Sequence, residues 1–300
     1  MGRRFGRVRF RANLSGSAPG RGRMTPPVTI AGRTARLWRE VGERVFVRRF
    51  PEFDVNVGLV IGGEAALVVD TRGSERQGRL LTDEIRWMTG TRIIVANTHH
   101  HYDHVFGNSA FGPTDIWAHE ACAARIKEQS PDAQLALAAT MPELGREYMD
   151  TRIVVPNKTI KAGATIDLGG RRVDFYHLGR GHTDNDMVVS VGDARTIFAG
   201  DLIEQGGPPS FEDAYPMDWS GTLSRLLEIV NGPVVPGHGD VVRKAFIEGQ
   251  QADMAALSQL ATRMRFDGGS VTDAVPLAPF PARVARVALK RAFAQLSGEL

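Results

Sequence analysis

The sequence contains a single cysteine, Cys122, among its 300 residues. One thiol cannot form a disulfide within the chain, which excludes the small secreted proteins held together by disulfides and favours a reducing compartment, the cytoplasm. Cys122 stands between alanines, where we expect an inert packing residue. The chain also lacks an apolar run of about 18–20 residues, the length that crosses a bilayer. We therefore expect no membrane partner.

Acidic residues are absent from residues 1–23, which contain seven arginines. Without these seven positive charges the formal net charge falls from +3 to −4, so the pI of about 9.2 comes from this segment and the remaining chain is mildly acidic. Nucleic-acid binding requires a basic surface, so nucleic acid is not an expected partner. Residues 1–24 are rich in Arg, Gly and Ser, and we expect a disordered tail or a non-native start with Met24 as the true initiator.

Histidine is scarce as well, but half of the eight histidines lie in the run HHHYDH at residues 99–104. This run reads H-x-H-x-D-H and follows the apolar stretch 92–97, which is typical of a strand. Imidazole nitrogens and carboxylates are the ligands of zinc and related metals. A strand end gives such ligands a rigid base.

Three later segments also lead from an apolar stretch to a residue of ligand type. His182 lies in a Gly-rich loop after the stretch 172–176, Asp201 ends the stretch 196–201, and His238 stands between two glycines after the stretch 233–236. Each residue taken singly is typical of a core or turn position. Four strand ends that all finish in ligand types favour a metal centre.

This order and spacing resembles the signature of the metallo-β-lactamase superfamily, H-x-H-x-D-H followed by separate His, Asp and His ligands. The resemblance covers roughly residues 40–240. It implies two Zn²⁺ ions, with Fe or Mn as possible replacements. The first ion is assigned to His99, His101 and His182, the second to Asp103, His104 and His238, and Asp201 bridges the two.

Two further residues are given supporting roles beside these ligands. Asp70 ends an early strand, where the family has an acidic residue that orients a ligand, as ligated imidazoles usually require. Thr183 follows His182 directly and is assigned a similar role.

The alternation of strand and helix patterns implies two packed sheets flanked by helices. The resemblance sharpens this expectation to an α/β fold, the four-layer αβ/βα sandwich with two mixed sheets. We expect a catalytic domain over residues 25–240 and a helical extension over 241–300 packed on it. The expected strands lie near 44–48, 55–61, 65–69, 152–155, 172–176, 187–191 and 195–199, and the expected helices near 76–89, 119–129, 130–150 and 219–230.

The implied function is that of a dinuclear metal-dependent hydrolase that uses a hydroxide shared by the metals to cleave a small ester, thioester or lactone. Asp103 is expected to be the catalytic residue that holds and orients this nucleophile. The Asp at position 201 resembles the thioesterases, lactonases and phosphoesterases, since true β-lactamases generally have Cys or Ser there. The acyl-homoserine lactonases place Tyr three residues later, where this chain has Glu204.

The substrate is expected to be a small molecule, and Glu204, Phe211 and Tyr215 are the candidates for lining its cleft. Three alternatives remain open at the level of sequence. They are a mononuclear iron oxidoreductase similar to the persulfide dioxygenases, a phosphodiesterase or nuclease, and a metal-binding module without turnover. The sequence does not indicate the oligomeric state.

Overall fold

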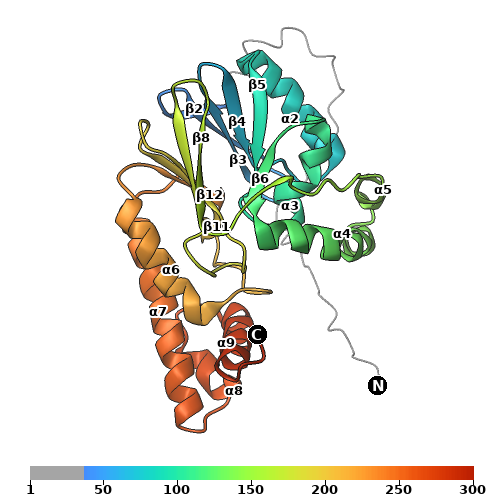
Figure 1. Cartoon of the computed structure of the whole chain (residues 1–300). Coiled ribbons are helices and arrows are strands. Elements are labelled where there is room, and N and C mark those ends of the chain that lie inside the picture. The colour runs from blue at the N-terminus through green and yellow to red at the C-terminus, as the bar shows by residue number, and fades with distance from the viewer. Residues whose placement is uncertain (1–36) are drawn as a thin grey trace, which may run out of the picture.

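The computed structural model describes residues 37–300. The Arg-rich segment 1–24 and the possible initiator Met24 lie outside the described residues. Two mixed β-sheets stack face to face, with helices on the outer side of each (Figure 1). This arrangement confirms the predicted α/β sandwich.

The first sheet has seven strands in sequence order, from β1 to β7. Pairing is antiparallel from β1 to β4 and parallel from β4 to β7. The strands are β1 (Arg39–Gly42), β2 (Val45–Arg49), β3 (Asn56–Ile61), β4 (Ala65–Val69), β5 (Arg92–Ala96), β6 (Ile116–His119) and β7 (Lys158–Ile160).

The second sheet has five strands in the order β12-β11-β10-β9-β8. All pairs are antiparallel except β11 and β12, which run parallel and end side by side, with Glu204 opposite His238. The strands are β8 (Gly163–Asp167), β9 (Arg172–Tyr176), β10 (Val188–Val191), β11 (Thr196–Glu204) and β12 (Val234–His238).

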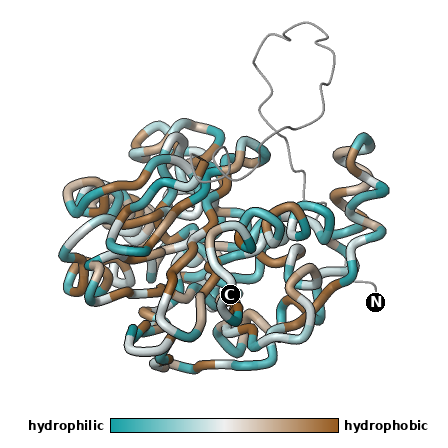
Figure 2. The backbone as a smooth tube through the Cα atoms, turned by 90° about the horizontal axis from the view of Figure 1, so that it is seen from above, coloured by the Kyte–Doolittle hydropathy of each residue, from teal (hydrophilic) through white to brown (hydrophobic). Residues whose placement is uncertain are grey.

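Successive side chains of a strand point to opposite faces of its sheet, and those that point between the two sheets form the core. In β9, Val173 and Phe175 are fully buried while their neighbours are not, and they join Val60 and Leu67 of the first sheet in one hydrophobic cluster. In Figure 2 many of the hydrophobic, brown stretches run through the middle of the molecule, and the hydrophilic, teal stretches lie mainly toward its periphery.

Helices cover the two outer faces. Leu81 and Ile85 of α2 pack on the first sheet, and α6, α7 and α9 form a cluster with Val188 and Ile197 of the second sheet. The helices are α2 (Glu75–Met88), α3 (Tyr102–Val105), α4 (Glu120–Thr140), α5 (Gly145–Met149), α6 (Pro216–Ile229), α7 (Lys244–Phe266), α8 (Val271–Ala274) and α9 (Ala282–Leu296), with 3-10 turns at Phe106–Phe111 and Val275–Leu277. None of the helices between residues 37 and 300 combines the length and apolarity needed to span a bilayer.

Two predicted elements differ in the structure. The helix expected to end near residue 129 continues to Thr140 with Pro131 inside it. Residues 152–155 form no strand although 153–155 are apolar, because the Val154 carbonyl accepts from the side chain of Asn108 and Pro156 follows. The strands of this region are β7 and β8, which carry few apolar residues.

Candidate metal centre

The residues of the H-x-H-x-D-H run follow β5 of the first sheet; His99 and His101 lie in the turn that leads into α3, and Asp103 and His104 lie within α3. The other three candidate ligands come from the second sheet: His182 from the loop between β9 and β10, Asp201 from β11, and His238 from the end of β12. The site is therefore built at the edge where the two sheets meet.

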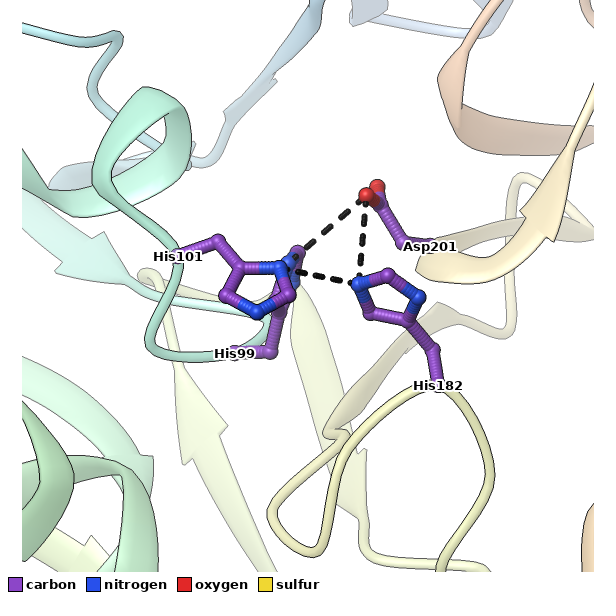
Figure 3. Close-up of side chains that lie close together, drawn as sticks. All are labelled: His99, His101, His182 and Asp201. Atoms are coloured by element: carbon purple, nitrogen blue, oxygen red, sulfur yellow. Dashed lines mark hydrogen bonds and ion pairs between the residues drawn. The ribbon is translucent and has the colours of Figure 1, made fainter. Parts of the chain in front are cut away.

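The first group consists of His99, His101, His182 and Asp201 (Figure 3). One ligand atom from each lies within 4.8 Å of all the others. Nε2 of His182 is 2.9 Å from Nδ1 of His101 and 3.5 Å from Oδ2 of Asp201. Nε2 of His99 is 3.7 Å from the same Asp201 oxygen. Four donor atoms thus surround one small volume.

The second group consists of Asp103, His104 and His238. Nε2 of His238 is 3.3 Å from Nε2 of His104 and 3.4 Å from Oδ2 of Asp103. Asp201 also reaches this group, because its Oδ1 is 3.3 Å from Nε2 of His104 and its Oδ2 is 3.2 Å from Nε2 of His238. The Asp201 carboxylate therefore lies between the two groups.

Buried atoms without partners show that the donor set fits a cation. His99 is 1% exposed, and its Nε2 has no hydrogen-bond partner among residues 37–300. An unpaired polar atom in the interior costs roughly 1–3 kcal/mol unless something satisfies it. Burial also lowers the pKa of His99 well below its usual value and that of His182 to about 4. Both imidazoles are therefore neutral at pH 7, which is the form that binds metal.

The two imidazoles of the second group each have a hydrogen-bond acceptor at the outer nitrogen. The Asp70 carboxylate is 2.9 Å from Nδ1 of His104, and the carbonyl of Phe53 is 2.8 Å from Nδ1 of His238. These acceptors hold the proton on Nδ1 and leave the Nε2 lone pair directed at the centre.

Asp70 is placed to orient His104 and to fix the loop that carries the other ligands. Its side chain is buried and also accepts from the backbone N–H and the hydroxyl of Thr98, each at 2.8 Å. Its φ of 65° is left-handed, a conformation that Asp tolerates better than most residues.

Two glycines allow Asp201 to reach this position. A Cβ at Gly237 would overlap Oδ1 of Asp201, and one at Gly200, where φ is 53°, would collide with the side chain of Thr98. The P-G-H sequence on β12 thus provides space for the carboxylate on the neighbouring strand β11.

The pKa values of His101 and Glu204 are both raised above their usual values, for different reasons. Burial lowers the pKa of His101, but the charge and the hydrogen bond of Asp213, together with the charges of Asp103 and Asp201, outweigh burial and raise that pKa to about 9. Burial, together with the charge of Asp201, raises the pKa of Glu204 to about 8. The centre is thus an enclosed cluster of strongly interacting charges.

The predicted supporting residue Thr183 and the predicted cleft residues Glu204 and Tyr215 lie in different surroundings. The Thr183 hydroxyl donates to Asp186 at 2.6 Å and so acts on the loop that carries His182 and not on a ligand side chain. Glu204 lies beside the first group, with Oε1 3.6 Å from Nδ1 of His182. Tyr215 is half-buried under the guanidinium of Arg180.

Phe211 does not fit its predicted place in the cleft. It is 2% exposed, and its ring packs edge-on to Trp219 and against Phe280. The loop 205–215 folds this aromatic residue inward onto the helices behind the second sheet, so the ring belongs to the core.

Sequence reasoning missed Asp213, whose Oδ2 is 3.2 Å from Nε2 of His101 and 3.5 Å from Nε2 of His100. These three residues form a third cluster of possible ligand atoms beside the first group. Asp213 lies in a loop without a strand pattern, far along the chain from the histidines. Its only sequence signal is its position in the loop that follows Asp201.

The model of the metallo-β-lactamase superfamily matches residues 50–238, well over half of the chain. The protein belongs to this superfamily. The match confirms the resemblance seen in the sequence and contains the whole candidate site.

Curated relatives in this superfamily are distant from the chain. A metallo-β-lactamase type 2 of Bacillus sp. (strain 170) is 24% identical over 197 residues, which are 63% of this chain and 69% of the relative. A hydroxyacylglutathione hydrolase of Synechococcus sp. (strain JA-2-3B'a(2-13)) is 25% identical over 139 residues, 46% of this chain and 45% of the relative.

Solved structures share the fold at still lower identity. A metallo-β-lactamase from Pontibacter korlensis superposes with a TM-score of 0.57 at 20% identity and covers 73% of this chain and 98% of its own. A double mutant of the sec-alkyl sulfatase PisA1 gives a TM-score of 0.69 at 16% identity and covers 89% of this chain and 52% of its own.

Proposed function

We propose that the protein is a hydrolase that holds two divalent cations, by preference zinc, and cleaves a small ester, thioester or lactone. The observation that carries this proposal is the pair of donor groups that share the Asp201 carboxylate. The relatives named as hydrolases support the hydrolytic class. The single buried cysteine supports a reducing compartment such as the cytoplasm.

The seven side chains would bind the two cations as two sets of ligands with one shared residue. His99, His101 and His182 would hold one ion, Asp103, His104 and His238 the other, and Asp201 would contact both. When bound, two such ions lower the pKa of a shared water and withdraw electrons from the carbonyl under attack. Imidazole and carboxylate donors are typical of zinc, and they also accept iron or manganese.

The position of Asp103 supports the proposal that it orients the nucleophile. It is 8% exposed, lies in the first turn of the short helix α3, and has its Oδ2 3.6 Å from Nε2 of His104 and 3.4 Å from Nε2 of His238. A carboxylate there can accept a hydrogen bond from a water and hold one lone pair of that water toward the substrate. No serine or cysteine nucleophile is needed, and the Cys122 thiol is fully buried away from solvent.

The decisive experiment is a hydrolase panel run with metal analysis on the protein purified without added metal. We expect about two zinc ions per chain and turnover of at least one ester, thioester or lactone. Asp103→Ala should lower kcat/KM by at least about 100-fold, the scale on which a positioned acid–base group acts. The matched control is Asp132→Ala, an exposed residue of α4 far from the site in sequence.

Two results would overturn this proposal. One is a single iron per chain together with oxygen uptake, which would make the protein an oxidoreductase. The other is activity in Asp103→Ala equal to that of the Asp132→Ala control, since the nucleophile would then be oriented elsewhere. Cleavage of RNA or a phosphodiester in place of the carbonyl substrates would retain the metal centre and change the substrate class.

A further inference from the structure

The Asp213 carboxylate faces the outer nitrogens of two neighbouring histidines. Nδ1 of His100 accepts from the side-chain amide of Asn185 at 3.0 Å, so the His100 proton lies on Nε2 and points toward Asp213. Nδ1 of His101 faces Nε2 of His182 in the first group, so the one proton that His101 retains in its neutral, metal-binding form lies on Nε2, 3.2 Å from the same carboxylate. Asp213 thereby selects the His101 tautomer that presents Nδ1 to the centre.

Helix α9 holds the backbone that carries Asp213. The guanidinium of Arg291 donates to two consecutive carbonyls, from Nη2 to that of Asp213 at 2.7 Å and from Nε to that of Ala214 at 2.9 Å. One turn later Gln295 accepts from the backbone N–H of Met217, at 3.0 Å, in the first turn of α6. Two turns of α9 thus fix both the end of the loop 205–215 and the start of the next helix.

The body of α9 gives this clamp a rigid base. Ala285, Ala288, Leu289 and Ala292 are fully buried and pack in the cluster formed by α6, α7 and the second sheet. The planar fork of an arginine on such a helix can hold two carbonyls in fixed relative positions, which a lysine cannot do. In Figure 1, α9 lies beside α7 at the end of the molecule that contains α6.

We propose that Asp213 and Arg291 are positioning residues of the first metal group, and that α9 is thereby a working part of the metal centre. The inference rests on the metal binding in the proposed function, but it concerns residues outside the H-x-H-x-D-H signature. The chain of contacts runs from Arg291 to the backbone of Asp213, from the Asp213 carboxylate to His101, and from His101 to the first group. Loss of either residue should release the His101 ring and leave the second group intact.

The test measures metal affinity directly in the full-length protein. Zinc is titrated in competition with a chromophoric chelator, and cobalt-loaded protein is followed by its visible absorption, which reports the ligand geometry. The variants are Asp213→Asn, Arg291→Ala and their combination. Arg286→Ala is the matched control, because Arg286 is an exposed arginine on the same helix.

We expect Asp213→Asn to weaken one of the two zinc ions by about 10–100-fold, the usual effect of removing a residue that orients a ligated histidine. Arg291→Ala should weaken the same ion, by a smaller factor, and Arg286→Ala should match the wild type. The double variant should lose less than the product of the two single effects, because both residues act through His101. If Arg291→Ala fails to fold, Arg291→Lys should give an intermediate affinity, since an ammonium replaces at most one of the two bonds.

Wild-type affinity for both ions in Asp213→Asn would overturn this inference and leave the proposed hydrolase intact. Additive losses in the double variant would also overturn it, because the two residues would then act separately. A wild type that binds two ions and hydrolyses nothing would instead overturn the proposed function, while a selective loss of one ion in Asp213→Asn would still support the positioning role.

Discussion

Gly237 offers a sharp test of the proposed centre, because one added methyl group should disturb both ions at once. It lies on β12 directly before His238, and its backbone passes beside the Asp201 carboxylate on β11. A Cβ built on Gly237 overlaps Oδ1 of Asp201. Its φ is not among the positive values of this chain, so alanine can adopt the local backbone and the effect is purely steric.

The size of the expected effect follows from the overlap between the added Cβ and Oδ1 of Asp201. The carboxylate of Asp201 must withdraw by about 1 Å or more to restore an ordinary contact. Overpacking of this kind costs about 1–3 kcal/mol, and we expect that loss in the urea-induced unfolding of metal-free Gly237→Ala. Because Asp201 approaches both donor groups, zinc affinity should fall at both sites, in contrast to the single-site loss expected for Asp213→Asn.

Gly249→Ala is the control. Gly249 lies on the exposed side of α7 and has nothing within 4 Å of an added Cβ. Alanine there should raise the free energy of unfolding by about 0.5–1 kcal/mol and leave zinc binding unchanged. Wild-type zinc affinity in Gly237→Ala would refute the reasoning, because Asp201 would then not be needed where the structure places it.

Three further outcomes are expected. Asp70→Ala leaves Nδ1 of His104 and two donors of Thr98 without their acceptor. The free energy of unfolding of the metal-free protein, measured in urea, should therefore fall by about 3–6 kcal/mol. A fall of less than about 1 kcal/mol would contradict the hydrogen-bond network around Asp70. Burial raises the pKa of the Cys122 thiol well above its usual value, so a thiol reagent at pH 8 should modify the unfolded chain and not the native one. Free zinc at about 100 times its dissociation constant should stabilise the fold by about 2.7 kcal/mol per site, measured by thermal unfolding with and without chelator, and no shift would count against metal binding.

Some of this molecule could be read from sequence because its signal is local. The H-x-H-x-D-H run and the strand-end residues Asp201 and His238 are short motifs, and strand patterns such as that of β9 alternate clearly. Asp70 could be found in the same way, since it follows a run of five buried residues in β4.

The remaining features depend on how distant segments meet in space. Asp213 lies 112 positions from His101, in a loop with no periodic pattern. Arg291 contacts the backbone of that loop, which no side-chain pattern can reveal. Phe211 was predicted to line the cleft because its loop directly follows Asp201, but its ring packs inward against Trp219.

The order of the proposed metal-binding residues along the chain determines when a metal ion can bind during synthesis at the ribosome. The four donors at residues 99–104 emerge first, but the carboxylate that both groups share arrives only with β11, and the last imidazole only with the end of β12. A half-translated chain would therefore offer a cation an incomplete set of ligands, from which competing cellular chelators can remove it. For the proposed pair of ions, capture becomes durable only after the end of β12 has been made, so metallation follows the synthesis of both sheets.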